Sequence, residues 1–376
     1  MKIFAAFIAV LTALTAFTVS TPALSDDELP LSAKSAAVMN YDTGELVFSK
    51  NAFEKRAMAS TTKIMTALLT IEAGDLDRKF TVDSMAIRVE GTSMGLKEGD
   101  IVTRRALCYG MLLPSGNDAA NAAAVSVSGS IAEFARLMNK RAAEIGMKDS
   151  SFVTPSGLDA EGHFTTAYDM ALLTREALQN ETFREICTAS TMTLEYGNPP
   201  YARTLTNLNK LIDVYDGCIG VKTGFTDNAK RCLVSAAKRE DVTVIAVTLN
   251  ASDDWNDHGK MLDYGFSEIR PHNIDAHTFA LEAVGGEFET VNAVPEKRLT
   301  LGLTDVSARK IRIKYCLPDF VYADISKGDR LGTAYVYCGD ILIDEIKLLA
   351  DTDCRRVQEN KSVWEEILDF FSAIFR

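Results

Sequence analysis

A serine and a lysine stand one helical turn apart early in the chain, at Ser60 and Lys63. The apolar residues of Met58–Ala73 recur at three- to four-residue spacing and Gly74 follows, which predicts a helix whose mouth holds the serine. Residues i and i+3 share one helical face, so the Lys63 amine can reach the Ser60 hydroxyl. The fold must therefore present a helix N-terminus, whose free N–H groups favour negative charge on an attacked carbonyl oxygen.

A serine hydroxyl is a poor nucleophile at neutral pH and needs a nearby base. A lysine can serve if burial or a neighbouring cation lowers its pKa enough to leave the amine neutral. The spacing alone does not identify the pair, because it recurs at Ser235/Lys238 and at Ser307/Lys310. Each match could equally be an ordinary helix cap beside a solvated lysine.

The N-terminal segment, residues 1–25, is typical of a secretory signal peptide. Lys2 precedes a long apolar run, and small residues follow at Ala23-Leu24-Ser25. A retained membrane anchor is the alternative, but Thr, Pro and Ser interrupt the run before it reaches the length of a full span. We therefore expect an exported protein.

The charge and the metal-binding residue types exclude other classes of protein. The formal net charge is −12, and loss of residues 1–25, which hold one lysine and no acid, makes it −13, so a nucleic-acid partner is not expected. The seven cysteines form no Cys-x-x-Cys pair and the four histidines no His-Glu-x-x-His, which argues against a zinc site. We expect no metal and no cofactor, and scattered buried thiols rather than assigned disulfides.

Strand patterns flank the helical part of the chain. Ala36–Tyr41 and Glu45–Lys50 surround a hairpin signal, Asp42-Thr43-Gly44. Further strands are predicted at Cys218–Thr226, Arg231–Ala237 and Thr243–Asn250, with helices at Arg105–Leu113, Ala119–Val127 and Ile131–Ile145. This first domain closes near Pro271. From Thr278 the pattern changes to short alternating strands, which predict a small all-β module.

Three motifs stand in order along the chain: Ser60-x-x-Lys63, Ser115-Gly116-Asn117 and Lys222-Thr223-Gly224. Together they resemble the signature of penicillin-binding proteins and serine β-lactamases. Only the first Ser-x-x-Lys match has both other motifs downstream and follows a two-strand hairpin, which selects Ser60. The resemblance to the D-alanyl-D-alanine carboxypeptidases, the low-molecular-mass penicillin-binding proteins, extends over about Leu31 to Phe266 through three more segments: Phe152–Asp159, Thr165–Ala171 and Asn207–Leu211.

The resemblance implies an α+β fold with an antiparallel sheet flanked by helices. It places a serine DD-peptidase domain at 31–271, the all-β domain at 272–355 and an amphipathic tail at 356–376. The implied activity is removal of the terminal D-alanine from peptidoglycan pentapeptides ending in D-Ala-D-Ala. β-Lactams are implied covalent inhibitors.

The resemblance also implies a role for the residues of the first two motifs. Ser60 attacks the carbonyl of the penultimate D-alanine and Lys63 takes its proton. Ser115 relays a proton toward the leaving amine, and Asn117 hydrogen-bonds the substrate amide.

The third motif is implied to bind the substrate. Lys222 supplies positive charge beside the base and the substrate carboxylate, Thr223 hydrogen-bonds that carboxylate, and Gly224 lets the substrate backbone approach the strand. The N–H groups of Ser60 and Phe225 are implied to form the oxyanion hole.

The sequence departs from the family pattern at three places. Family members often carry an arginine just before an aromatic residue in the loop that here reads Ser252–His258, and this loop has none. The carboxylate site is therefore expected to rely on Lys222 and Thr223. Phe225 replaces the usual His or Tyr, and Ala229-Lys230 replaces Ala-Gly.

Other functions with the same motifs remain open at this point. A serine β-lactamase would need a general-base glutamate, and no Glu-x-x-x-Asn or Glu-x-x-Leu-Asn element lies between Ser115 and Lys222. A DD-transpeptidase differs only in the acyl acceptor. A non-catalytic wall-binding protein would have no need of the complete set of catalytic side chains.

The C-terminal tail carries apolar residues at helical spacing from Trp364 to Phe375, with acids on the other side. It is too short and too charged to span a bilayer. We expect it to lie in the outer face of the cytoplasmic membrane and to hold the exported enzyme there as a peripheral protein. The alternative is a helix that packs on the β-module.

Overall fold

The structure is a computed structural model that describes residues 29–357. Its first domain is built on a five-stranded antiparallel sheet with the order β2-β1-β9-β8-β7. The strands are β1 Ser35–Asn40, β2 Leu46–Lys50, β7 Cys218–Thr226, β8 Lys230–Arg239 and β9 Val242–Ala251. The nearly continuous burial of β1, β8 and β9 shows that helices cover both faces of the sheet. The predicted hairpin and meander are both present.

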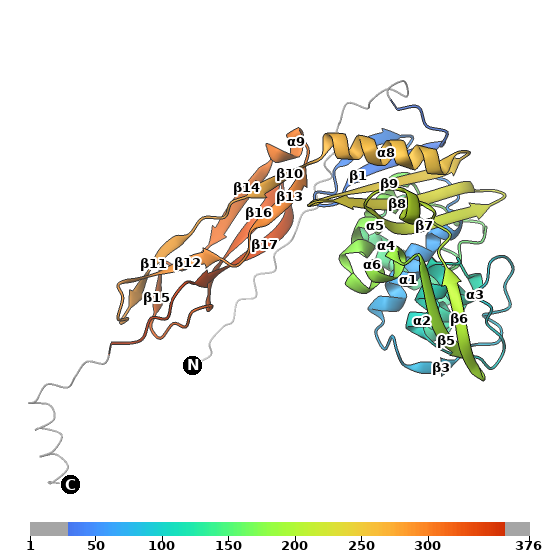
Figure 1. The fold of residues 1–376 in the computed structure, drawn as a ribbon, viewed down its shortest axis with the longest axis horizontal. Helices are drawn as coiled ribbons and strands as arrows, with labels where there is room; N and C mark the ends of the chain where they lie inside the picture. The colour runs from blue at the N-terminus through green and yellow to red at the C-terminus, as the bar shows by residue number, and fades with distance from the viewer. Residues whose placement is uncertain (1–28, 358–376) are drawn as a thin grey trace, which may run out of the picture.

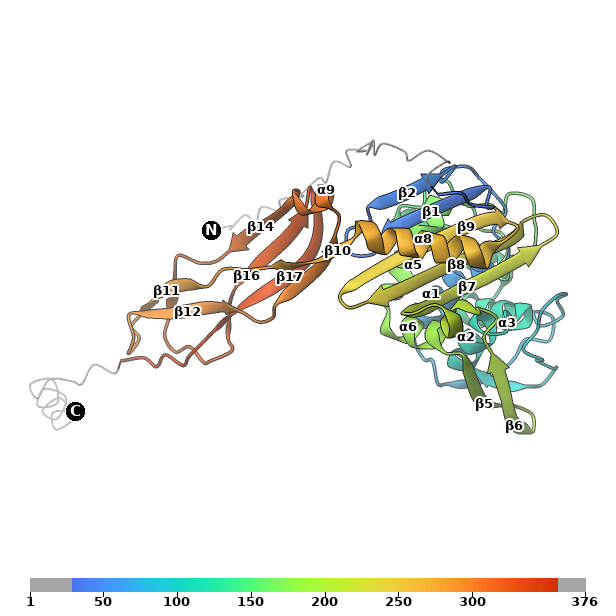
Figure 2. The same cartoon turned by 45° about the horizontal axis from the view of Figure 1, so that its top comes forward.

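Helix α8, Asp254–Glu268, and the short helix α7, Leu211–Val214, lie on one face of the sheet, and the other helices of the first domain lie against the opposite face (Figures 1 and 2). They begin with the short 3₁₀ helix η1, Ala59–Thr62, and its continuation α1, Lys63–Glu72. The remaining helices on that face are α2 Arg104–Leu112, α3 Asn117–Ser128, α4 Ile131–Ile145, α5 Ala167–Gln179 and α6 Glu181–Thr188.

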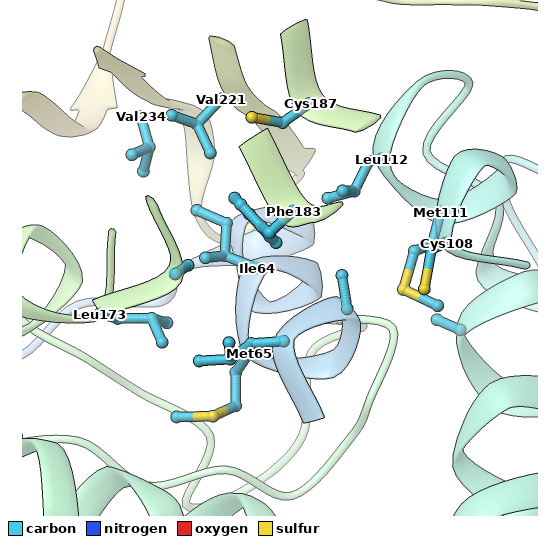
Figure 3. Close-up of a cluster of buried hydrophobic side chains, with 14 of the residues drawn as sticks. Ile64, Met65, Cys108, Met111, Leu112, Leu173, Phe183, Cys187, Val221 and Val234 are labelled. Atoms are coloured by element: carbon cyan, nitrogen blue, oxygen red, sulfur yellow. The ribbon is translucent and has the colours of Figure 1, made fainter. Parts of the chain in front are cut away.

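Helix α1 forms the centre of the main hydrophobic core, and every residue from Lys63 to Ile71 is buried. Side chains from α2, α5, α6 and the sheet surround Ile64 and Met65 of α1, as Figure 3 shows for Cys108, Met111, Leu112, Leu173, Phe183, Cys187, Val221 and Val234. A helix that is buried on every side lies inside a domain. The nucleophile motif is thus attached to a helix that is packed on all sides.

Two small antiparallel pairs lie at the edge of the helical layer. One joins β3, Lys79–Thr81, to β4, Ile101–Thr103, and the other joins β5, Thr191–Gly197, to β6, Pro200–Thr206. The sequence analysis predicted neither pair. Arg203 of β6 stacks on Tyr196 and donates to the Gly95 carbonyl at 2.7 Å, which ties this hairpin to the segment before α2.

The second domain is all-β, as predicted. Its six-stranded sheet has the order β14-β16-β17-β12-β11-β15, in which only β11 and β15 pair in parallel, and a separate pair joins β10 to β13. The strands are β10 Arg270–Ile274, β11 Phe279–Val284, β12 Thr290–Pro295, β13 Leu299–Leu303, β14 Ile311–Cys316, β15 Phe320–Tyr322, β16 Arg330–Cys338 and β17 Ile341–Ala350, with helix α9 at Asp305–Ala308.

Direct hydrogen bonds join the two domains around Gly302. Its carbonyl accepts from Asn40 Nδ2 at 2.8 Å, and its N–H donates to Asp42 Oδ2 at 2.6 Å. Nearby, the Thr304 hydroxyl donates to Glu45 Oε2 at 2.8 Å. Asn40 is fully buried, so its bond to the Gly302 carbonyl is shielded from water, whereas the bonds of Asp42 and Glu45 are partly buried. The second domain extends away from the first as an elongated arm (Figure 1).

The predicted signal peptide, and all but the first two residues of the predicted amphipathic tail, lie outside residues 29–357. Among the residues that the structure describes, no helix is both long enough and apolar enough to cross a bilayer. All seven cysteines are free thiols, and five of them are buried.

Acid should destabilise the fold through His258 of α8. This buried imidazole bonds Ser235 of β8 through Nδ1 at 2.5 Å and Thr248 of β9 through Nε2 at 2.9 Å. Burial lowers its pKa from 6.5 to about 3. The folded pKa lies below the unfolded one, so the unfolded chain binds the proton first and stability falls as pH drops from 6.5 toward 3.

At about 1.4 kcal/mol per pH unit the loss is on the order of 4 kcal/mol at pH 3. Urea unfolding at several pH values measures it. A His258→Gln variant, whose amide cannot take up this proton, should show a flatter acid limb than the parent. Parallel curves for the two proteins would contradict the assignment.

Candidate active site

The mouth of α1 holds Ser60 in a fixed backbone conformation. Ser60 is half-buried, whereas its neighbours Ala59 and Thr61 are buried. Ala59 has φ 49°, a left-handed value that is uncommon for alanine. A β-carbon on Gly157 would lie only 1.9 Å from the Ala59 carbonyl oxygen, so only glycine fits there. The loop before α5 therefore presses directly on the residue that precedes the serine.

His163 ties the same loop to the helix. The Val153 N–H donates to its Nδ1 at 3.0 Å, so Nδ1 is the acceptor and the proton is on Nε2, 3.0 Å from the Thr62 hydroxyl. Burial lowers the pKa of His163 to about 4, which keeps the ring neutral. Through these two contacts, His163 connects the loop to the start of the nucleophile helix. The sequence analysis assigned it no role, because the histidine is ten residues from one partner and 101 from the other.

Lys63 is fully buried, and its amine lies within hydrogen-bonding distance of three oxygen atoms. Nζ is 2.8 Å from Ser60 Oγ, 2.7 Å from Asn117 Oδ1 and 2.6 Å from the Ser156 carbonyl. The amide and carbonyl oxygens can only accept hydrogen bonds. A neutral amine has two hydrogens and one lone pair, so the two acceptors take both hydrogens. The lone pair is then left for the Ser60 hydroxyl proton.

Electrostatics favour the neutral amine. Burial lowers the pKa of Lys63 well below 10.5, repulsion from Lys222 lowers it further, and the carboxylate of Asp118 opposes this in part. An ammonium group out of water loses its solvation, so the deprotonated form becomes the stable one. The predicted combination of burial and a neighbouring cation is present around the base.

Asn117 begins α3 and links the base to the loop before α2. Its Nδ2 donates to the Glu90 carbonyl at 2.7 Å, which fixes the amide so that Oδ1 faces Lys63. Both ends of the amide are thus engaged within the protein. The sequence analysis expected this amide to bind the substrate, and the structure adds a bond to the lysine. Ser115, two residues before it, is buried and has φ 66°.

Asp118, which the sequence analysis did not single out, organises the loop above Ser115. Its carboxylate accepts from the Ser93 hydroxyl at 2.5 Å and from the backbone N–H groups of Met94 and Leu96, each at 2.9 Å. The side chain is buried, and multiple N–H donors stabilise its charge. The sequence did contain a signal for this role, because Asp118 is an acid in the first turn of a predicted helix that follows a glycine.

Strand β7 brings the third motif to the serine. A β-carbon on Gly224 would lie 3.0 Å from the Ser60 nitrogen and 3.1 Å from the Thr61 nitrogen. The glycine thus lets strand β7 itself come close to the N-terminus of the nucleophile helix. The sequence analysis predicted a close approach of the substrate at this glycine, and the structure adds this contact within the protein. Lys222 is buried, its Nζ donates to the Thr223 carbonyl at 2.8 Å, and burial lowers its pKa to about 7. Phe225 is 61% exposed.

At the other two Ser-x-x-Lys matches the serine has a structural role. Ser235 is buried in β8 against His258, and Lys238 is exposed. Ser307 forms the capping box of α9 with Thr304, and Lys310 is exposed. Neither pair lies on one face of a helix. Of the three matches, only Ser60/Lys63 has its hydroxyl and amine in contact.

The model of a family described as "D-alanyl-D-alanine carboxypeptidase" matches residues 17–253 of this chain, nearly two-thirds of its length. The chain belongs to this family. A second model, described as "Penicillin-binding protein 5, C-terminal domain", matches residues 277–356. The protein is therefore a serine hydrolase of the penicillin-binding class, and its fold class agrees with the family.

Individual carboxypeptidases of this family match most of the chain. The D-alanyl-D-alanine carboxypeptidase DacF of Bacillus subtilis is 35% identical over 343 residues, which cover 88% of this chain and 87% of that protein. The carboxypeptidase of a Streptomyces species is 34% identical and covers 66% of this chain and 92% of that protein. Among solved structures, the Streptomyces K15 DD-transpeptidase superposes with a TM-score of 0.61 at 32% identity, covering 63% of this chain and 98% of that one.

Proposed function

We propose that this carboxypeptidase removes the terminal D-alanine from peptidoglycan stem peptides that end in D-Ala-D-Ala, through an acyl-enzyme on Ser60. The observation that carries the proposal is the Lys63 amine, held by two oxygens that can only accept and a third that belongs to the nucleophile. Ser60 Oγ bonds to the carbonyl carbon of the penultimate D-alanine as its proton passes to Nζ of Lys63.

The other site residues serve binding and the second proton transfer. The N–H groups of Ser60 and Phe225 stabilise the oxyanion. Ser115 relays a proton to the nitrogen of the departing D-alanine as the peptide bond breaks. Lys222 and Thr223 bind the terminal carboxylate, and water then attacks the ester to release the shortened peptide and free the serine.

Asn117 has a second task in this scheme. Its Oδ1 takes one hydrogen of the Lys63 amine, so it directs the lone pair as well as facing the substrate. The Ser156 carbonyl takes the other hydrogen. Because these two acceptors take both hydrogens, the lone pair of Lys63 can accept a proton only from the side of Ser60.

DD-transpeptidation is the second candidate, since the solved structure of a relative is titled a DD-transpeptidase. Acylation is the same in both reactions, and an amine instead of water accepts the acyl group. A β-lactamase would hydrolyse the penicilloyl ester rapidly and release penicilloic acid. The acceptor and the ester lifetime therefore separate the three functions.

Mass spectrometry after two incubations tests the proposal. Benzylpenicillin should add its full mass as a long-lived ester on the peptide that contains Ser60, because the opened ring stays in the site. A peptide ending in D-Ala-D-Ala should lose one alanine, and an added amine acceptor should capture little of it. An adduct on another serine, or none at all, would refute the assignment. Rapid release of penicilloic acid would show a β-lactamase.

We also propose that the chain works as two units, a catalytic domain over 31–271 and an all-β domain over 272–355. The predicted tail, residues 356–376, is proposed to hold the exported enzyme on the outer face of the cytoplasmic membrane. Its support is the apolar stripe from Trp364 to Phe375 with acids opposite.

Deletion of residues 361–376 should release the protein from lipid vesicles. Hydrolysis of a soluble D-Ala-D-Ala peptide should be unchanged, because the site lies in the first domain. Flotation with vesicles measures binding, and thermal unfolding is the control. A fall in unfolding temperature with no change in flotation would favour a helix that packs on the all-β domain.

A further inference from the structure

The hairpin of β5 and β6 holds the loop that borders the second motif. Figures 1 and 2 show the hairpin beside α2 and α3. Arg203 of β6 donates from Nη1 to the Gly95 carbonyl at 2.7 Å, and the Tyr196 hydroxyl of β5 donates to the Met94 carbonyl at 2.8 Å. Both carbonyls belong to residues 90–96, called here the 90–96 loop. Each strand of the hairpin thus holds one carbonyl of this loop.

The guanidinium group of Arg203 is fixed in one direction. Its carbon lies 4.2 Å from the ring centre of Tyr196 and 4.1 Å from that of Tyr201, so two aromatic rings enclose it. Nη2 lies 3.5 Å from the carboxylate of Asp100, and both side chains of this ion pair are nearly buried. Within residues 29–357, the buried Nε has no hydrogen-bond partner. A buried donor without a partner costs free energy, so the guanidinium is oriented at some cost to the fold.

The 90–96 loop packs directly on the amide of Asn117. The Glu90 carbonyl accepts from Asn117 Nδ2 at 2.7 Å, and a β-carbon on Gly91 would lie only 2.7 Å from the same nitrogen. The N–H of Gly95, whose carbonyl the hairpin holds, donates to the Asp118 carboxylate at 3.1 Å. The position of the loop therefore decides where the Asn117 amide lies.

The Asn117 amide in turn orients the base. Its Oδ1 lies 2.7 Å from Lys63 Nζ and takes one hydrogen of the amine. If the loop moved, Nδ2 would lose the Glu90 carbonyl and the amide would be free to rotate. Since an amide nitrogen cannot accept a hydrogen bond, a rotated amide would leave the lone pair of Lys63 without a fixed direction.

We propose that Arg203 is a positioning residue for the base: it holds the 90–96 loop, and the loop fixes the Asn117 amide that orients the Lys63 amine. The inference rests on the proposed function, in which the lone pair of Lys63 takes the proton of Ser60. It extends the catalytic apparatus to a hairpin that lies outside the three sequence motifs.

An Arg203→Met variant removes the donors and the charge and keeps an unbranched apolar side chain. The rate constant for acylation by a chromogenic β-lactam should fall about 10- to 100-fold, because a misplacement of about 1 Å in a catalytic group has an effect of this size. Every molecule should still be acylated at the end of the reaction. Arg203→Lys, which keeps one donor and the charge, should fall between the parent and Arg203→Met. Stopped-flow absorbance measures the rate constant, and intact mass measures the final fraction acylated.

Arg141→Met is the matched control, because Arg141 is an arginine with strong bonds that do not lead to the site. It donates to Glu72 at 2.7 Å and to Glu176 at 2.6 Å. Its loss should lower the unfolding temperature and leave the rate constant of the folded protein unchanged. A merely structural Arg203 would behave in the same way, with a smaller fraction acylated at the parent rate constant, and this result overturns the inference.

A double-mutant cycle tests the route through Asn117. In an Asn117→Ala background, whose slow acylation by benzylpenicillin is followed by intact mass over hours, Arg203→Met should lower the rate by less than about threefold, because the amide that it positions is absent. A larger loss there overturns the inference. A parent enzyme that forms no penicillin ester defeats the proposed function itself.

Discussion

A Ser60→Ala variant is expected to form no covalent adduct with benzylpenicillin and to release no D-alanine. The reaction needs an oxygen nucleophile at the mouth of α1, and the hydroxyl nearest the base is that of Ser60, 2.8 Å from Lys63 Nζ. Loss of a nucleophile typically removes nearly all of the rate above the contribution of binding and of the oxyanion hole. Intact-mass spectrometry and a D-alanine release assay measure the two effects.

The control for this variant is Ser307→Ala, which removes the serine of another Ser-x-x-Lys match. Ser307 is the third helical residue in the capping box of α9 in the second domain, so its loss should cost about 1 kcal/mol of stability and leave acylation at the parent rate. Ser60→Ala itself should unfold near the parent temperature, since the hydroxyl is half-buried. A penicillin adduct that survives in Ser60→Ala would show that another residue is the nucleophile.

A Lys63→Arg variant should lose about 10²- to 10⁴-fold in the rate of acylation, the usual contribution of a positioned general base. A guanidinium keeps its proton in proteins and cannot accept one from Ser60. Burial makes the lysine amine neutral, whereas it leaves the arginine charged. Stopped-flow acylation by a chromogenic β-lactam measures the rate.

Lys310→Arg supplies the matched conservative change at an exposed lysine and should leave the rate unaltered. Circular dichroism of Lys63→Arg separates loss of the base from loss of the fold, because the larger cation enters a fully buried site. A folded Lys63→Arg enzyme within tenfold of the parent, about 1.4 kcal/mol in barrier, would remove Lys63 from the role of base.

The sequence predicts elements best where hydrophobic periodicity and caps agree. Ile131–Ile145 is a helix over the predicted range because Ser130 caps its start and Gly146 its end. Cys218–Thr226 likewise has the predicted bounds. The hairpin of β5 and β6 was not predicted because most of its residues alternate between exposed and half-buried positions, and its stability comes from contacts such as Arg203 with Gly95.

The candidate site divides in a similar way. Side-chain types in motif spacing lead to Ser60, Lys63 and the Lys222 strand. The Ser156 carbonyl and the Glu90 carbonyl escape such reasoning because every residue has a carbonyl, and only the folded backbone decides which one faces the amine.

The hydrogen bonds around Gly302 allow the second domain to act as a spacer that sets the distance between the active site and the C-terminal end of the chain. A rotation there would have to break the buried bond of Asn40 and the partly buried bond of Asp42, so these contacts resist a change in the angle between the arm and the catalytic sheet. If the chain beyond residue 357 rests on a surface, the serine stands at one height above it. The enzyme would then trim only those stem peptides that lie in a thin layer of the wall, and inserting rigid residues after Val357 would shift that layer outward.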